Sequence, residues 1–93
     1  MGDRIVFRGR VRHWREDPPG GLAVIDIPSD LVATLGGRKQ YRALGTLNGT
    51  PFAGSTMLVA GGGFAVGVAK LALKEAGLGV GDEVDVALGR AAD

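Results

Sequence analysis

The chain has no cysteine among its 93 residues. This absence excludes disulfide bonds, thiolate catalysis and sulfur ligands for a metal ion. Histidine is nearly as scarce: His13 is the only one, and a zinc site lacks the three or four nitrogen or sulfur ligands that it needs. Asp82, Glu83 and Asp85 lie close in sequence but form no calcium-binding loop motif. We therefore expect no metal ion and no cofactor.

A long hydrophobic run is also missing, because no stretch approaches the roughly 18 apolar residues of a transmembrane helix. No apolar signal region precedes the first strand-like pattern, which begins near Arg4. The net charge is only +1, so no overall field attracts nucleic acid or an anionic membrane. These absences predict a cytoplasmic protein that makes no membrane contact.

Glycine is the residue present in excess, with 17 copies and no collagen-like period. Glycine spread in this way is typical of the many tight turns and bulges that all-β domains need. Hydrophobic residues make up 45% of the chain and charged residues 23%, which argues against disorder. For this length we expect one domain with one core over residues 1–93.

Apolar and polar residues alternate with the period of two that half-buried strands show. In residues 4–14 the apolar face carries Ile5 and Val11, and the other face carries arginines. Residues 16–21 are rich in proline and glycine and predict a loop, and residues 89–93 predict a flexible tail. The predicted strands cover residues 4–14, 22–27, 41–47, 57–59, 64–68 and 83–88.

Asn48-Gly49 predicts a type I′ hairpin turn, because that turn needs a positive φ at both central positions. A two-residue loop there places Leu47 opposite Thr50 and Gly45 opposite Phe52. Pro51 has no amide hydrogen to donate, so its nitrogen should face a sheet edge or a bulge.

Two short helices complete the predicted elements. The first is expected to begin with Ser29 or Asp30 as its N-cap and to end at residues 36–37. The second follows Ala69 and ends at Gly77 in a left-handed C′ position. Six or so strands without repeating βα units predict a mainly β fold, a small single-domain barrel with two short helices.

Two glycine-rich segments have part of the spacing of nucleotide-binding loops but not the context. Residues 61–67 follow a strand, yet the residues after the glycines alternate like another strand instead of beginning a helix. Residues 36–40 lack the serine or threonine that follows the lysine of a Walker loop. We interpret residues 61–67 as a turn and exclude residues 36–40 as a phosphate loop.

Basic side chains gather on the polar face of the first predicted strand, at Arg8, Arg10 and Arg12. Joined in space by Arg38 and Lys39, they would form a patch that binds phosphates in a salt-dependent way. Alternatively, the first and last strands pair and Glu83 and Asp85 neutralise part of this arginine stripe. Each such pair would stabilise by less than about 1 kcal/mol. We favour the pairing interpretation.

His13 and Trp14 end the same strand. Trp14 either packs in the core, which we favour, or forms the floor of a small-molecule pocket. His13 is either structural, which we favour, or part of a small enzyme that works by acid–base catalysis through His13, Asp26 or Tyr41.

Two longer motifs resemble those of a known family. Residues 45–52 read G-T-L-N-G-T-P-F, and residues 76–84 read A-G-L-G-V-G-D-E-V. With residues 25–28, residues 61–64 and Lys70, they resemble the bacterial family called domain of unknown function 1905 over nearly the whole chain. This resemblance implies a small, mostly β, barrel-like domain and no catalytic residues. Similar sequences tend to carry arginine where this chain has Leu73. This departure makes the face more apolar and weakens any anion-binding role for the second helix, although Lys70 and Lys74 remain.

We predict a non-catalytic binding domain that holds a small molecule or a partner protein at the barrel. A nucleic-acid-binding or regulatory module that uses the arginine stripe is the first alternative, based on fold analogy alone, and the acid–base enzyme is the second. Exposed strand edges and a small core would allow a homodimer. The residues predicted to contact a ligand are His13, Trp14, Tyr41, Arg42, Phe52, Met57, Lys70 and Lys74.

Overall fold

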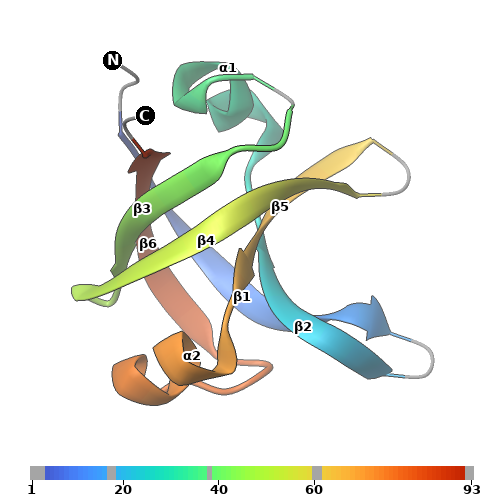
Figure 1. The fold of residues 1–93 in the computed structure, drawn as a ribbon, viewed down its shortest axis with the longest axis vertical. Helices are drawn as coiled ribbons and strands as arrows, with labels where there is room; N and C mark the ends of the chain where they lie inside the picture. The colour runs from blue at the N-terminus through green and yellow to red at the C-terminus, as the bar shows by residue number, and fades with distance from the viewer. Residues whose placement is uncertain (1–3, 17–18, 38, 60–61, 92–93) are drawn as a thin grey trace.

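The computed structural model describes residues 4–16, 19–37, 39–59 and 62–91. Six antiparallel strands form a closed barrel in the order β1-β2-β5-β4-β3-β6 (Figure 1). The predicted barrel with two short helices is confirmed. The strands are β1 (Ile5–Glu16), β2 (Pro19–Asp26), β3 (Arg42–Leu47), β4 (Thr50–Val59), β5 (Gly63–Val68) and β6 (Glu83–Arg90). The helices are α1 (Val32–Leu35), preceded by the 3-10 turn η1 (Ser29–Leu31), and α2 (Lys70–Ala76).

Two long strands, β1 and β4, allow the barrel to close. The first half of β1 pairs with β6 and its second half with β2. In the same way, residues 50–55 of β4 pair with β3, and residues 56–59 pair with β5. The sequence predicted only short pieces of β4, because Gly54 and Ser55 interrupt its apolar pattern.

The alternation predicted for β1 and β6 is confirmed. Ile5 and Val11 are buried while Arg8 and Arg10 are exposed, and Val84, Val86 and Leu88 of β6 are buried. Burial of one such aliphatic side chain stabilises the fold by about 1.5–3 kcal/mol. The helices lie at opposite ends of the molecule in Figure 1 and add three buried side chains to this core: Val32, Leu35 and Leu73.

The hairpin between β3 and β4 has the predicted turn and register. Asn48 has φ 49° and Gly49 has φ 87°, Leu47 lies opposite Thr50, and Gly45 lies opposite Phe52. A Cβ atom on Gly45 would collide with the carbonyl oxygen of Ala87 in β6. The close approach of β6 therefore requires glycine at position 45.

The end of α2 is also as predicted. Gly77 adopts the left-handed conformation with φ 71°. Its amide donates to the Lys74 carbonyl oxygen at 3.1 Å, and the Leu78 amide donates to Leu73 at 2.9 Å. This pair of bonds is the Schellman motif, and Leu78 packs against the core beside it.

Three further boundaries differ from the prediction. The segment predicted as a loop at residues 16–21 is mostly strand, since Arg15 pairs with Gly20 and Glu16 with Pro19 after a register shift. Such a bulge accommodates breaker residues at strand ends, and residues 17–18 lie outside the described part of the chain. The predicted N-caps Ser29 and Asp30 lie inside the 3-10 turn η1. The N-cap residue of η1 is Pro28 and that of α1 is Leu31, and neither makes a side-chain cap hydrogen bond.

The predicted tail at residues 89–93 is wrong at its start. Gly89 pairs with Leu44 and Arg90 with Ala43, so β6 continues through both residues. The Ala91 amide then donates to the Arg42 carbonyl oxygen at 2.9 Å. The backbone of β3 satisfies these polar groups although the apolar alternation ends at Leu88. Residues 92–93 lie outside the described residues.

Candidate functional site

A depression of about 310 Å³ lies where the chain enters β3, beside the second half of β4. Three of the residues predicted to contact a ligand, Tyr41, Arg42 and Met57, come together here. The remaining lining residues are polar, namely Gln40, Ser55 and Thr56.

Thr56 holds the two sides of this depression together. Its side chain points inward and is 1% exposed. The hydroxyl donates to the Lys39 carbonyl oxygen at 2.9 Å and accepts the Tyr41 amide at 2.9 Å. The Thr56 amide donates in turn to the Tyr41 carbonyl oxygen at 2.9 Å. These bonds fix residues 39–41 against β4. The sequence signal that could have identified Thr56 is a polar residue at an inward-facing position of a strand.

Tyr41 is half-buried, and its ring centroid lies 6.2 Å from that of Phe64. Its hydroxyl oxygen is buried and has no hydrogen-bond partner among the described residues. Burial raises the pKa of the Tyr41 phenol above its ordinary value of 10.0, and the positive charge of Arg90 opposes this rise.

Arg90 is a residue of this region that the sequence did not indicate. Its guanidinium carbon lies 4.7 Å from the centroid of the Tyr41 ring, a cation–π arrangement. The side chain passes so close to Gly36 that a Cβ atom there would lie 2.5 Å from Arg90 Cδ. The glycine that ends α1 therefore makes room for the arginine.

The other five predicted ligand residues lie away from this depression. His13 and Trp14 are half-buried on β1, where His13 pairs with Ala23 of β2. Phe52 is 7% exposed and belongs to the core. Lys70 and Lys74 are exposed on α2.

The residues considered for acid–base catalysis are not joined. Both carboxylate oxygens of Asp26 accept from Arg12, at 2.7 and 2.9 Å. Within the described ranges, no hydrogen bond links His13, Asp26 and Tyr41.

The arginine stripe is paired, as the favoured interpretation predicted. Arg8 lies opposite Asp85 and Arg10 opposite Glu83 in the β1–β6 ladder. The shortest N–O distances of these two ion pairs are 3.1 and 3.3 Å. Arg12 binds Asp26 on β2, so three arginines face three carboxylates. A depression of about 370 Å³ along this stripe is therefore close to electrically neutral. Arg38, predicted to join the patch, lies outside the described residues.

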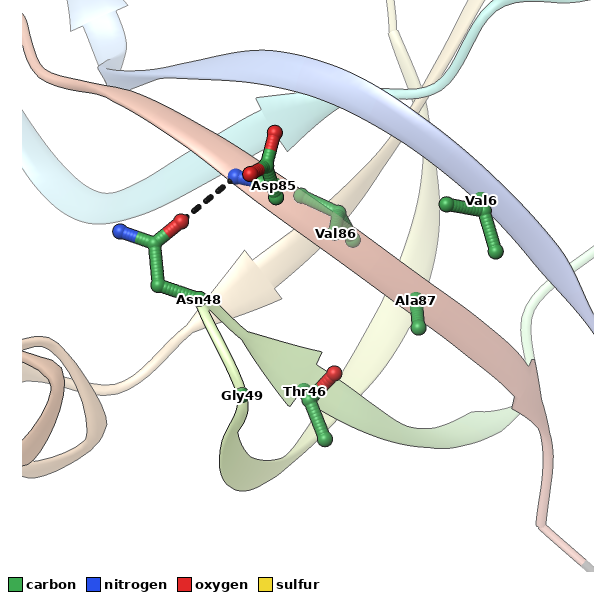
Figure 2. A pocket seen from close by; sticks show the side chains of 7 residues that line it. All are labelled: Val6, Thr46, Asn48, Gly49, Asp85, Val86 and Ala87. Atoms are coloured by element: carbon green, nitrogen blue, oxygen red, sulfur yellow. Dashed lines mark hydrogen bonds between the residues drawn. The ribbon is translucent and has the colours of Figure 1, made fainter.

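A larger depression, of about 400 Å³, lies over β3 and β6 (Figure 2). Figure 2 shows the Asn48 side chain pointing to the Asp85 amide, which donates to Asn48 Oδ1 at 2.8 Å. The Asp85 carboxylate is bound by Arg8. None of the predicted ligand residues lines this depression, and two of its polar groups are already paired. We therefore take the depression beside Tyr41 as the candidate site.

The glycine turn before β5 leads directly into a strand. Gly62 has φ 97°, and β5 begins at the next residue, so a strand follows the glycine turn where a phosphate loop needs a helix. No group of three histidine, aspartate or glutamate residues within the described ranges could hold a metal ion. Among the described helices, none has the length and apolar character needed to cross a membrane.

Comparison with protein-family models identifies a family for this chain. Residues 7–88 match the family model described as Domain of unknown function (DUF1905). No curated protein matches the chain. The match covers most of the barrel, from the third residue of β1 to Leu88 in β6.

Proposed function

The chain belongs to the DUF1905 family, and we propose that it is a non-catalytic binding domain that holds a small molecule in the depression beside Tyr41. The observation that carries this proposal is the set of three predicted ligand residues, Tyr41, Arg42 and Met57, which line one depression. At about 310 Å³ its volume lies at the lower end of the range usual for small-molecule sites.

Two further features support the proposal. The depression is preorganised, because Thr56 fixes the backbone on its rim at residues 39–41. It also combines apolar surface from Met57 with unpaired polar groups, since neither Arg42 nor Ser55 has a side-chain partner in the described ranges. A small-molecule pocket needs apolar surface for affinity and a few polar groups that fix the orientation of the ligand.

A thermal-shift screen against a broad metabolite panel tests the proposal, with a variant that fills the depression. Ser55 is exposed, lines the depression and points outward from β4, so Ser55→Phe should block it. Ala53→Phe is the matched control, because Ala53 is exposed on the same face of β4 but does not line the depression. Ligands that stabilise the wild type and Ala53→Phe should not stabilise Ser55→Phe.

Two results would refute the proposal. One is that no compound of the panel raises the melting temperature of the wild type. The other is that compounds stabilise Ser55→Phe as much as Ala53→Phe, which would place their binding elsewhere on the barrel.

A further inference from the structure

The distribution of acidic residues along the chain differs from that of basic residues. No aspartate or glutamate occurs between Asp30 and Glu75, yet five cationic residues lie in that segment. The segment contains β3, β4 and β5, which are neighbours in the barrel order. One continuous side of the barrel therefore has no carboxylate of its own.

The candidate site lies on this side, close to three cations. Arg42 lines the depression, Lys39 is three residues before it, and Arg90 covers the Tyr41 ring. All three cations are exposed, and no carboxylate is paired with any of them in the described ranges.

The nearest carboxylate on the neighbouring strand β6 lies at the other end of the ladder. The Asp85 backbone amide donates to Asn48 Oδ1, just beyond the last residue of β3, whereas Arg42 is the first residue of β3. Five strand residues at about 3.4 Å each separate these two ends by about 17 Å, which is roughly twice the screening length at physiological salt. Asp85 is moreover paired with Arg8. It does not neutralise the site.

From this arrangement we infer that the ligand carries an oxyanion, a carboxylate or a phosphate, bound by Arg42, with an apolar group against Met57 and Tyr41. The inference rests on the proposed function. An arginine fork matches the planar geometry of a carboxylate and also binds phosphate. Ser55, which lies opposite Arg42 in the β3–β4 ladder, adds a hydroxyl donor.

Three aromatic probes that differ only in their polar group test this inference: benzoate, phenyl phosphate and uncharged benzamide. Binding is followed by the NMR shifts of the backbone amides of residues 40–42 and 55–57. We expect saturable shifts with benzoate, phenyl phosphate or both, and at least tenfold weaker binding of benzamide. The stronger of the two charged probes identifies the kind of oxyanion.

Arg42→Gln should weaken binding of the charged probe at least tenfold. Lys70→Gln is the matched control, because it removes the same charge from an exposed residue that does not line the depression. It should change the affinity less than twofold, and an equal loss in both variants would indicate a general field effect and overturn the role of Arg42.

The two proposals fail in different ways. If benzamide binds as tightly as the charged probes and Ser55→Phe blocks this binding, the inference of an oxyanion ligand is wrong but the binding site is supported. Two outcomes would overturn the site itself. One is that a probe causes saturable shifts that persist in Ser55→Phe. The other is that no probe causes a shift and no compound of the metabolite panel stabilises the protein.

Discussion

The guanidinium of Arg90 lies 4.7 Å from the centre of the Tyr41 ring. This contact joins the last residue of β6 to the residue that precedes β3, and it occurs beside the candidate site. At exposed sites such a contact stabilises by about 0.5–1 kcal/mol. Because Tyr41 is the only tyrosine of the chain, its phenol reports directly on this region.

Replacement of Arg90 should raise the pKa of Tyr41 further. Burial raises this pKa above 10.0 and the charge of Arg90 opposes the rise, so Arg90→Gln removes the opposing effect. Absorbance of the tyrosinate during a pH titration measures the change. Arg8→Gln, which alters an ion pair on another strand, should leave the titration unchanged. An unchanged or lower pKa in Arg90→Gln would contradict the structure.

The stability of the protein should fall as the pH rises above about 10. The pKa of Tyr41 is raised in the folded state, so the folded chain keeps a proton that the unfolded chain loses. This contribution is complete below the unfolded pKa of about 10 and disappears as the pH rises through the folded pKa. Tyr41→Phe should lack this part of the loss in urea unfolding.

At neutral pH, Tyr41→Phe should change the free energy of unfolding by less than about 1 kcal/mol, because the buried hydroxyl that it removes has no partner among the described residues. A large destabilisation at neutral pH would mean that this hydroxyl makes a hydrogen bond.

Thr56→Val should lower the free energy of unfolding by about 1–3 kcal/mol. The substitution keeps the shape of the side chain but leaves the Tyr41 amide and the Lys39 carbonyl without their partner in a buried place. Urea unfolding measures the loss. Ser55→Ala, at the exposed neighbouring position, should stay within about 0.5 kcal/mol of the wild type. Equal effects of the two substitutions would contradict the role assigned to Thr56.

The arginine stripe should bind DNA weakly even at low salt, because each of its three arginines faces a carboxylate. Neutralisation of these carboxylates in Asp26→Asn/Glu83→Gln/Asp85→Asn should create salt-dependent binding of a random DNA duplex. Fluorescence anisotropy at several salt concentrations distinguishes the two proteins. Strong, salt-dependent binding by the wild type would instead favour the nucleic-acid alternative.

Pro51 should limit self-association through β4. Residues 50–55 pair only with β3 in the described part of the chain. In a hairpin with a two-residue loop, the position of Pro51 directs its nitrogen away from the partner strand. Pro51→Val supplies an amide donor to this edge and should increase the dimer fraction in light scattering after gel filtration. Thr50→Val, which adds no donor, is the control. Identical masses for the wild type and both variants would show that Pro51 does not limit self-association through this edge.

Much of the barrel could be predicted from local patterns. The alternation in β1 and β6, the positive φ pair at Asn48-Gly49 and the glycine cap at Gly77 are short-range properties, since each depends on the chemistry of a few consecutive residues. The register of the β3–β4 hairpin follows from the same turn. The pairing of Arg8 and Arg10 with β6 was predicted from two signals: the complementary charges of the two strands and the tendency of first and last strands to pair when a barrel closes.

The candidate site depended on contacts between distant segments. Arg90 looked like part of a flexible tail, because its contact with the Tyr41 ring depends on pairing of β6 with β3 and on the space left by Gly36. Of eight predicted ligand residues, only the three near the start of β3 and the second half of β4 came together. The sequence alone predicted most of the strands, the main turns and the kinds of chemistry that its composition excludes. Which side chains share a depression was decided by the closure of the barrel, because pairing between strands far apart in sequence has no local signal.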